Sequence, residues 1–216
     1  MLIGISGMVS SGKSTLSNKL FNHFKNSLLL KEFDEDKDGV FHTLLDIKFK
    51  NQGNSSINFS FEAYILENHL NCLDKLLNQF DQEKNKYIFL DRFSLEHGIF
   101  ALTDFMFQKF PKRSFEAYKA MSKIMVEPRH LPELIIYLDV SFDTFKQRIF
   151  NRQRDSEVEN WNLNEPYFRL LFDNYKKHFL DLLKNANINY IVIDTNDLNE
   201  DQVFEVAKEA ILQFQK

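Results

Sequence analysis

The sequence of 216 residues contains one cysteine, four prolines and six glycines. The single Cys72 excludes a disulfide framework and a metal site built from several thiolates. So little proline and glycine is untypical of collagen, of long linkers and of disordered chains. No apolar run approaches the roughly 18–20 residues of a membrane-spanning helix. The N-terminus lacks the basic segment of a secretory signal, so we expect a cytoplasmic protein without a membrane partner.

An excess of basic charge is also absent. The 27 Lys and Arg residues are outnumbered by 31 Asp and Glu residues, which gives a net charge of −4. Proteins that bind a nucleic acid polymer usually carry a basic surface that neutralises phosphates. We therefore expect no nucleic acid partner, although a local basic pocket is compatible with this composition.

Five apolar segments bounded by polar or turn-forming residues predict buried parallel strands. They are Leu2–Ser6, Ser27–Phe33, Tyr87–Asp91, Leu134–Val140 and Asn189–Asp194. Amphipathic segments lie between them and predict helices near 16–24, 65–80, 94–108, 114–126, 141–153, 166–186 and 200–215. Strands that alternate with helices are typical of an α/β fold, a doubly wound parallel sheet with helices on both faces. No linker or repeat interrupts the pattern, so residues 1–216 are predicted to form a single domain.

A phosphate-binding loop is predicted directly after the first strand. Residues Gly7–Thr15 match the pattern G-x-x-x-x-G-K-[ST], and a helical pattern follows at once. Glycines let the backbone N–H groups turn toward phosphate oxygens, and the helix N-terminus favours the same anion. Lys13 is expected to reach the β- and γ-phosphates, and the Ser14 hydroxyl to complete a Mg²⁺ shell. The residues expected to hold the nucleoside triphosphate are Gly7, Ser10, Ser11, Gly12, Lys13, Ser14 and Thr15.

Charged residues are predicted to reach this loop from two further segments. Asp91 and Arg92 end the third strand, where a carboxylate positions Mg²⁺ and an arginine holds an anionic group. Arg148 and Arg152 are four residues apart and therefore share a helix face, and Arg154 follows them. Several cations on a movable segment suit the negative charge of a phosphoryl-transfer transition state. We predict a helical lid over about residues 148–162.

An acidic segment follows the second strand. Glu32 stands where a carboxylate could take a proton from an attacking hydroxyl group. The same segment contains Asp36-Lys37-Asp38-Gly39, which fits the D-x-x-G pattern of GTPases. No N-K-x-D occurs anywhere in the chain, so we interpret that match as accidental.

Taken together, these motifs resemble those of the deoxynucleoside kinase family, particularly its bacterial deoxyadenosine and deoxyguanosine kinases. The resemblance covers nearly the whole chain and is most specific at the phosphate loop, at Asp91-Arg92 with Glu96, and at the R-I-x-x-R-x-R-x-x-E pattern of residues 148–157. It implies a five-stranded parallel sheet, a homodimer, and transfer of the ATP γ-phosphate to a 5′-hydroxyl group.

The resemblance also implies roles for individual residues. Glu32 corresponds to the general base, and Arg92 to the arginine that orients this base and the substrate. Lys13 and Arg148 join them as catalytic residues, while Arg152 and Arg154 correspond to lid cations on the nucleotide. Glu157 corresponds to a lid carboxylate near the deoxyribose, and Asp194 and Asn196 belong to a loop on the adenine side.

The sequence departs from the family at the residues that contact the base. Glu62 occupies the helical position where the family has a glutamine, and His97 stands where it has an aspartate. An ionised Glu only accepts hydrogen bonds, whereas Gln both donates and accepts. We therefore expect Glu62 to favour guanine, which presents adjacent N–H donors, with His97 as a further substrate contact.

Two alternatives remain open. Asp91-Arg92-Phe93 also resembles the D-R-[YF] motif of thymidylate kinases, but no arginine lies between residues 16 and 91 to hold an acceptor phosphate. A nucleotide-dependent switch without an acceptor is the other alternative. A nucleoside requirement for ADP production distinguishes a kinase from a switch.

Overall fold

The sheet has five parallel strands in the order β2-β3-β1-β4-β5. The computed structural model of the chain describes residues 1–31, 39–50, 55–83, 86–152 and 161–215. The strands are β1 (Leu2–Gly7), β2 (Ser27–Leu30), β3 (Tyr87–Asp91), β4 (Leu134–Asp139) and β5 (Asn189–Asp194). All five predicted strands are therefore confirmed, with their ends within a residue or two wherever the structure describes them.

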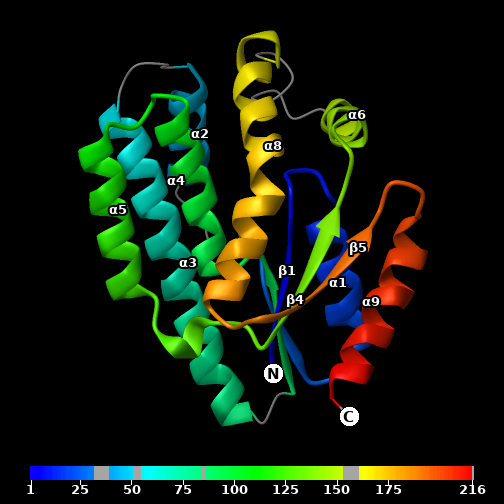
Figure 1. Cartoon of the computed structure of the whole chain (residues 1–216). Helices are drawn as coiled ribbons and strands as arrows, with labels where there is room; N and C mark the ends of the chain where they lie inside the picture. Colours follow the sequence, from blue (N-terminus) through cyan, green and yellow to red (C-terminus); the bar gives the residue numbers. More distant parts are fainter. Residues whose placement is uncertain (32–38, 51–54, 84–85, 153–160, 216) are drawn as a thin grey trace.

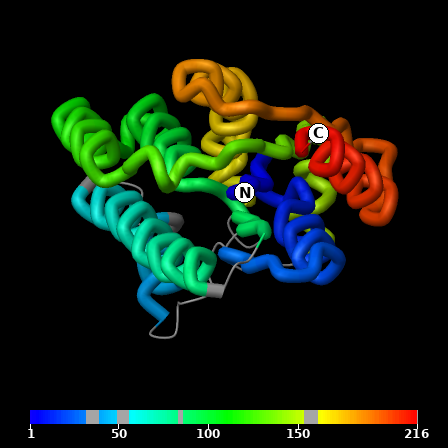
Figure 2. Tube along the Cα trace, turned by 90° about the horizontal axis from the view of Figure 1, so that it is seen from below, coloured from blue at the N-terminus to red at the C-terminus, as the bar shows by residue number. Residues whose placement is uncertain are grey.

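Helices cover both faces of the sheet (Figures 1 and 2). The α-helices are α1 (Lys13–His23), α2 (Val40–Lys50), α3 (Ser55–Glu83), α4 (His97–Met106), α5 (Lys112–Met125), α6 (Phe142–Arg152), α8 (Trp161–Asn185) and α9 (Glu200–Phe214). Two short 3₁₀ helices, Ser94–Glu96 and Pro128–His130, precede α4 and β4. In Figure 2, α1 and α9 lie on one side of the sheet, and α3, α4, α5 and α8 lie on the other. The predicted doubly wound α/β fold is confirmed.

Apolar side chains fill the space on both faces of the sheet, as expected for a parallel sheet that is covered on both sides. Ile3 and Ile5 of β1 belong to a core formed with α1 and α9. Ile88 and Leu90 of β3 belong to a larger core on the opposite face, which includes side chains of α3 and α8. Because the strands are parallel, their carboxyl ends meet at one edge, where ligands of such sheets bind.

Three helices differ from the predictions, and one of them is α3, which begins at Ser55 and not near residue 65. Helix α2 was not predicted, and it packs against α3 through the rings of Phe41 and Phe61 at 5.6 Å. Helix α8 begins at Trp161, before the predicted helix near 166–186. Burial of the Trp161 ring, stacked on Phe168 at a centroid distance of 5.3 Å, explains the additional turn.

Within the described part of the chain, no helix is both long enough and apolar enough to cross a membrane.

Candidate active site

The phosphate loop joins β1 to α1 in a conformation that requires its glycines. Gly12 precedes the first turn of α1 with φ = 100°, a left-handed conformation that side chains disfavour. A Cβ atom at Gly7 would lie 2.5 Å from the backbone oxygen of Leu138. The buried Lys13 ammonium donates a hydrogen bond to the backbone oxygen of Met8 at 2.9 Å, so this side chain lies along the loop.

Two hydroxyl groups in this loop fit a phosphate ligand. The Oγ atoms of Ser10 and Ser11 are buried, and neither has a hydrogen-bond partner among the described residues. A buried hydroxyl without a partner is unfavourable, because it has lost its hydrogen bonds to water. Phosphate oxygens would supply acceptors at this position, beside the N-terminus of α1.

Ser14 and Asp91 bring two hard oxygen ligands together. Ser14 Oγ in the first turn of α1 donates a hydrogen bond to Oδ2 of Asp91 at the end of β3, with a distance of 2.5 Å. Mg²⁺ prefers oxygen ligands and is commonly held by one or two protein groups together with phosphate oxygens. The described residues contain no cluster of three or more His, Cys, Asp or Glu side chains that could hold a metal by themselves. The pair therefore suits an ion that arrives with the nucleotide.

Arg92 is the centre of a buried network behind the phosphate loop. Its Nη1 atom donates to Gly7 O at 3.1 Å, to the Tyr175 hydroxyl at 2.6 Å and to Glu96 Oε1 at 2.5 Å. Glu96 Oε2 accepts a hydrogen bond from Ser6 Oγ at 2.7 Å. Arg92 has φ = 75°, a strained conformation for a residue with a side chain. The network thus fixes Arg92 against the start of the loop.

A second buried charge cluster lies on the helices α2, α3 and α4. Lys48 Nζ is 2.6 Å from Glu62 Oε1 and 2.9 Å from Asp104 Oδ2. Burial and the neighbouring Asp104 raise the pKa of Glu62 to about 7, although the Lys48 ammonium opposes this shift. The predicted base-contacting carboxylate is thus paired with a lysine, a partner that sequence reasoning did not identify.

His97 lines the same cavity as Glu62 and pairs with another histidine. His97 Nε2 is 3.3 Å from Nδ1 of His69, and both rings are buried. Burial and the Arg92 guanidinium lower the pKa of His97 to about 3, so the ring is neutral at physiological pH. His69 lies seven residues after Glu62 on α3, which is two helical turns on the same face, and this spacing could have revealed it.

Arg148 of α6 connects the phosphate loop with the loop that follows β5. Its guanidinium donates to Ser11 O at 3.2 Å and to Thr195 O at 2.8 Å. Asn196 is joined by hydrogen bonds to the side chain of Asp194 and to Ser141 N, so it stabilises the same loop. Thr195 accepts hydrogen bonds from Arg148 through both its hydroxyl and its backbone oxygen, and it was not among the predicted site residues.

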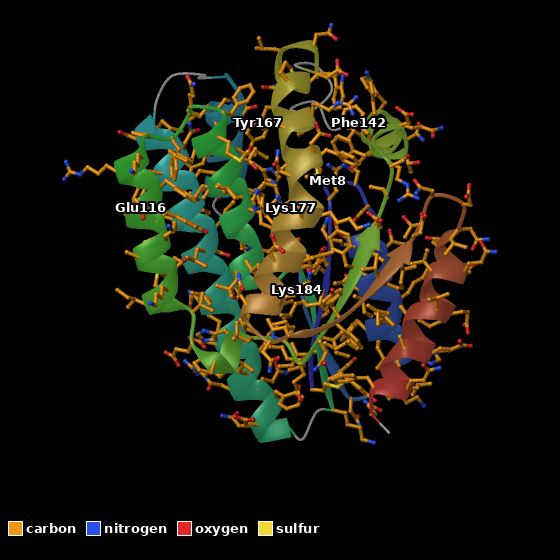
Figure 3. The ribbon with its side chains drawn as sticks, viewed as in Figure 1. Met8, Glu116, Phe142, Tyr167, Lys177 and Lys184 are labelled. Atoms are coloured by element: carbon orange, nitrogen blue, oxygen red, sulfur yellow. The ribbon has the colours of Figure 1, made fainter. Side chains whose placement is uncertain are left out.

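One cavity of about 540 Å³ unites these groups and extends from the phosphate loop to Lys48 and Glu62. This volume lies within the range of small-molecule sites. Tyr167 lines the cavity from α8; in Figure 3 it lies at the level of α2 and α4, well above Lys177 and Lys184. The predicted site residues in the lining are Ser10, Ser11, Gly12, Lys13, Ser14, Thr15, Glu62, Arg92, His97, Arg148 and Arg152.

Other predicted site residues lie outside this lining. Gly7 and Asp91 lie directly behind it, and Asp194 and Asn196 lie on either side of Thr195. Glu32, Arg154 and Glu157 fall outside the residues that the structure describes. The roles of all these residues stay predictions.

Comparison with known proteins places the chain among nucleoside-phosphorylating enzymes. The family model described as "Deoxynucleoside kinase" matches residues 3–214. The deoxyadenosine kinase of Lactobacillus acidophilus is 27% identical over 203 residues, which cover 88% of each chain. A Mycoplasma pneumoniae protein called "Uncharacterized protein MG268 homolog" is 26% identical over 207 residues, covering 94% of this chain and 88% of that protein.

A solved structure is similar in fold along almost the whole chain. The deoxyadenosine kinase of M. mycoides with bound dCTP superposes with a TM-score of 0.78 at 22% identity, covering 99% of this chain and 100% of that one.

Proposed function

The chain belongs to the deoxynucleoside kinase family, and we propose that it transfers the γ-phosphate of ATP to the 5′-hydroxyl of a purine deoxynucleoside in nucleotide salvage. Membership of this family identifies the protein as an enzyme that phosphorylates deoxynucleosides. The observation that supports the proposal best is the single cavity that runs from the phosphate loop to the buried polar cluster at Glu62. One end suits phosphates, and the other suits a polar base edge.

In the proposed reaction, the nucleotide phosphates lie on the loop between β1 and α1. Lys13 and the hydroxyls of Ser10 and Ser11 contact phosphate oxygens. Arg148 lies between this loop and Thr195, where it can stabilise negative charge on the transferred group while holding both loops. Arg152, which lines the same cavity from the end of α6, supplies a second cation.

Ser14 and Asp91 are the residues that would hold Mg²⁺. The ion supplies charge neutralisation on the β- and γ-phosphates when it is bound with ATP. Their hydrogen bond of 2.5 Å keeps the two oxygens adjacent, so little reorganisation is needed for both to face one ion.

The proton of the acceptor hydroxyl needs a base. We assign this role to Glu32, on the strength of the family resemblance and of its position two residues after β2. As the 5′-oxygen bonds to the γ-phosphorus, the bond from that phosphorus to the bridging oxygen breaks and ADP leaves. The hydroxyl proton goes to the Glu32 carboxylate. By the same resemblance, Arg154 and Glu157 complete the lid, and the protein acts as a homodimer in the cytoplasm.

The test is ADP release with Mg–ATP and each of the four deoxynucleosides, with thymidine monophosphate as a fifth acceptor. We expect turnover with a purine deoxynucleoside and none without an acceptor. Lys13→Ala should abolish it, whereas Lys19→Ala, a change at a partly exposed lysine of the same helix, should not. Turnover with the monophosphate alone would favour a thymidylate kinase, and acceptor-independent hydrolysis would favour a switch.

A further inference from the structure

Lys48 is a buried lysine at the end of the cavity far from the phosphate loop. Only 4% of its side chain is exposed, and the values for its partners Glu62 and Asp104 are 1% and 0%. Its ammonium contacts one carboxylate oxygen of each partner, at 2.6 Å and 2.9 Å. Burying a lysine costs free energy unless its charge is paired, so the two carboxylates account for its presence.

The four charges in this region balance without a ligand. Lys109 follows α4, and its ammonium lies 4.8 Å from the centre of the Tyr167 ring. The negative charge of the Asp104 carboxylate favours the charged form of both lysines. Two lysines thus compensate Glu62 and Asp104, so neither carboxylate of this cluster is buried without a counter-charge.

The members of this cluster differ in their relation to the cavity. Lys48 and Glu62 line it, whereas Asp104 and Lys109 do not. The hydrogen bond from Lys48 reaches Oε1 of Glu62, and none from another described residue reaches Oε2. An ammonium group has three N–H donors, and Glu62 accepts one of them, whereas Asp104 is an ion-pair partner whose oxygens accept no hydrogen bond from the ammonium. The ring of Phe61, 4.8 Å away, is a weak partner for another.

The cavity therefore ends in one strong donor beside one strong acceptor, both charged. We propose that Lys48 is a specificity-determining residue, and that Lys48 and Glu62 together recognise the lactam edge of a 6-oxopurine. In this arrangement, Lys48 donates to the C6 carbonyl oxygen and Glu62 accepts from N1–H. The inference rests on the proposed function and extends it from purines to guanine and hypoxanthine.

Adenine fits this pair less well at the same position. It presents an amino group to the ammonium and an unprotonated ring nitrogen to the carboxylate, so both contacts join groups of the same kind. If adenine shifted so that its amino group faced Glu62 and its N1 faced Lys48, the donors and acceptors would match. The amino group is, however, a poorer donor than the more acidic lactam N–H. Guanine adds a 2-amino group, a second donor for the same carboxylate.

Deoxyinosine and deoxyadenosine provide the direct comparison, because they differ only at this edge. We expect the wild-type enzyme to have a kcat/KM at least about tenfold higher for deoxyinosine, and higher again for deoxyguanosine. Lys48→Met should lower kcat/KM for deoxyinosine by about 10- to 100-fold, the worth of one hydrogen bond to a charged group. The kcat/KM for deoxyadenosine should fall much less, so the ratio of kcat/KM for deoxyinosine to that for deoxyadenosine should decrease.

Two further variants separate recognition from folding. Lys109→Met removes a neighbouring positive charge outside the cavity lining, and should leave the ratio of the two kcat/KM values unchanged. The double variant Lys48→Met with Glu62→Gln removes both charges and keeps an amide at position 62. It should fold even if Lys48→Met does not, and should accept both nucleosides with similar kcat/KM.

The proposal is overturned if the wild-type enzyme prefers deoxyadenosine to deoxyinosine, or accepts only pyrimidine nucleosides. It is also overturned if the double variant keeps the wild-type ratio. None of these results would contradict deoxynucleoside phosphorylation itself, whereas inactivity toward every deoxynucleoside would contradict the proposed function.

Discussion

Glu96 forms a buried ion pair with Arg92, in which Oε1 and Nη1 are 2.5 Å apart and the side chains are 0% and 2% exposed. The same carboxylate accepts hydrogen bonds from the Ser6 and Tyr175 hydroxyls. These contacts join the end of β1, the segment after β3 and the middle of α8. The strained backbone of Arg92 is thereby held in place directly behind the phosphate loop.

Glu96→Ala should lower the free energy of unfolding by about 3–5 kcal/mol, because it leaves the Arg92 guanidinium buried without its counter-charge. Tyr175→Phe is the matched variant. It removes one hydroxyl from the same network and should cost only about 1 kcal/mol. Urea unfolding followed by circular dichroism measures both. Equal losses for the two variants would show that the ion pair does not dominate the network.

Asp91→Asn should weaken activation by Mg²⁺ about 10- to 100-fold, since the amide is neutral but can still accept the hydrogen bond from Ser14. The measurement is turnover against Mg²⁺ concentration at fixed ATP. Asp139→Asn is the control, because Asp139 also ends a strand but pairs with Lys176 outside the main cavity. An unchanged Mg²⁺ requirement in Asp91→Asn would remove Asp91 from the metal site.

The strands and the phosphate loop could be predicted because their signals are local. Each strand is a short apolar run, and the loop is a contiguous motif between a strand and a helix. The helix 55–83 was predicted only over its central part, and its approach to α2 was not foreseen. That contact depends on long-range packing, including the rings of Phe41 and Phe61 at 5.6 Å.

The polar partners of the site could not be predicted, because their meaning depends on tertiary packing. A lysine in a sequence is usually expected to be exposed to solvent. Lys48 becomes buried only because α2 packs against α3 and α4. Glu62 was predicted as a lone acceptor, but the structure pairs it with that lysine. The position of His97 was identified from the family pattern, whereas its neighbour His69 was not identified as part of the site.

Recognition of a 6-oxopurine should weaken as the pH falls through about 7, because Glu62 gains a proton and no longer accepts from N1–H. The charged and titratable groups facing it are Lys48 of α2, Asp104 of α4 and Tyr118 of α5, with Tyr167 of α8 nearby. The KM for deoxyguanosine should therefore rise between pH 8 and pH 6, whereas Glu62→Gln should remove this dependence. A KM that is flat with pH in the wild type would contradict ionised Glu62 as the acceptor.

His97 should make the folded protein sensitive to acid. Burial and Arg92 lower its pKa in the folded state to about 3, below its ordinary value of 6.5. Between these two values the unfolded chain binds a proton that the folded chain does not, so stability is present above pH 6.5 and is lost as the pH falls. The contribution of this one group is about 1.4 kcal/mol per pH unit within that window.

His97→Gln should remove this contribution while keeping a polar side chain beside His69. The measurement is the free energy of urea unfolding at intervals between pH 7.5 and pH 5 for the wild type and the variant. The difference between the two should shrink by about 1.4 kcal/mol for each pH unit below about 6, because only the wild type pays for an uncharged histidine there. His23→Gln, a change at an exposed histidine on α1, should retain the wild-type pH dependence. Parallel curves for wild type and His97→Gln would mean that His97 has the same pKa in the folded and the unfolded protein, so that its burial does not keep the ring neutral below pH 6.5.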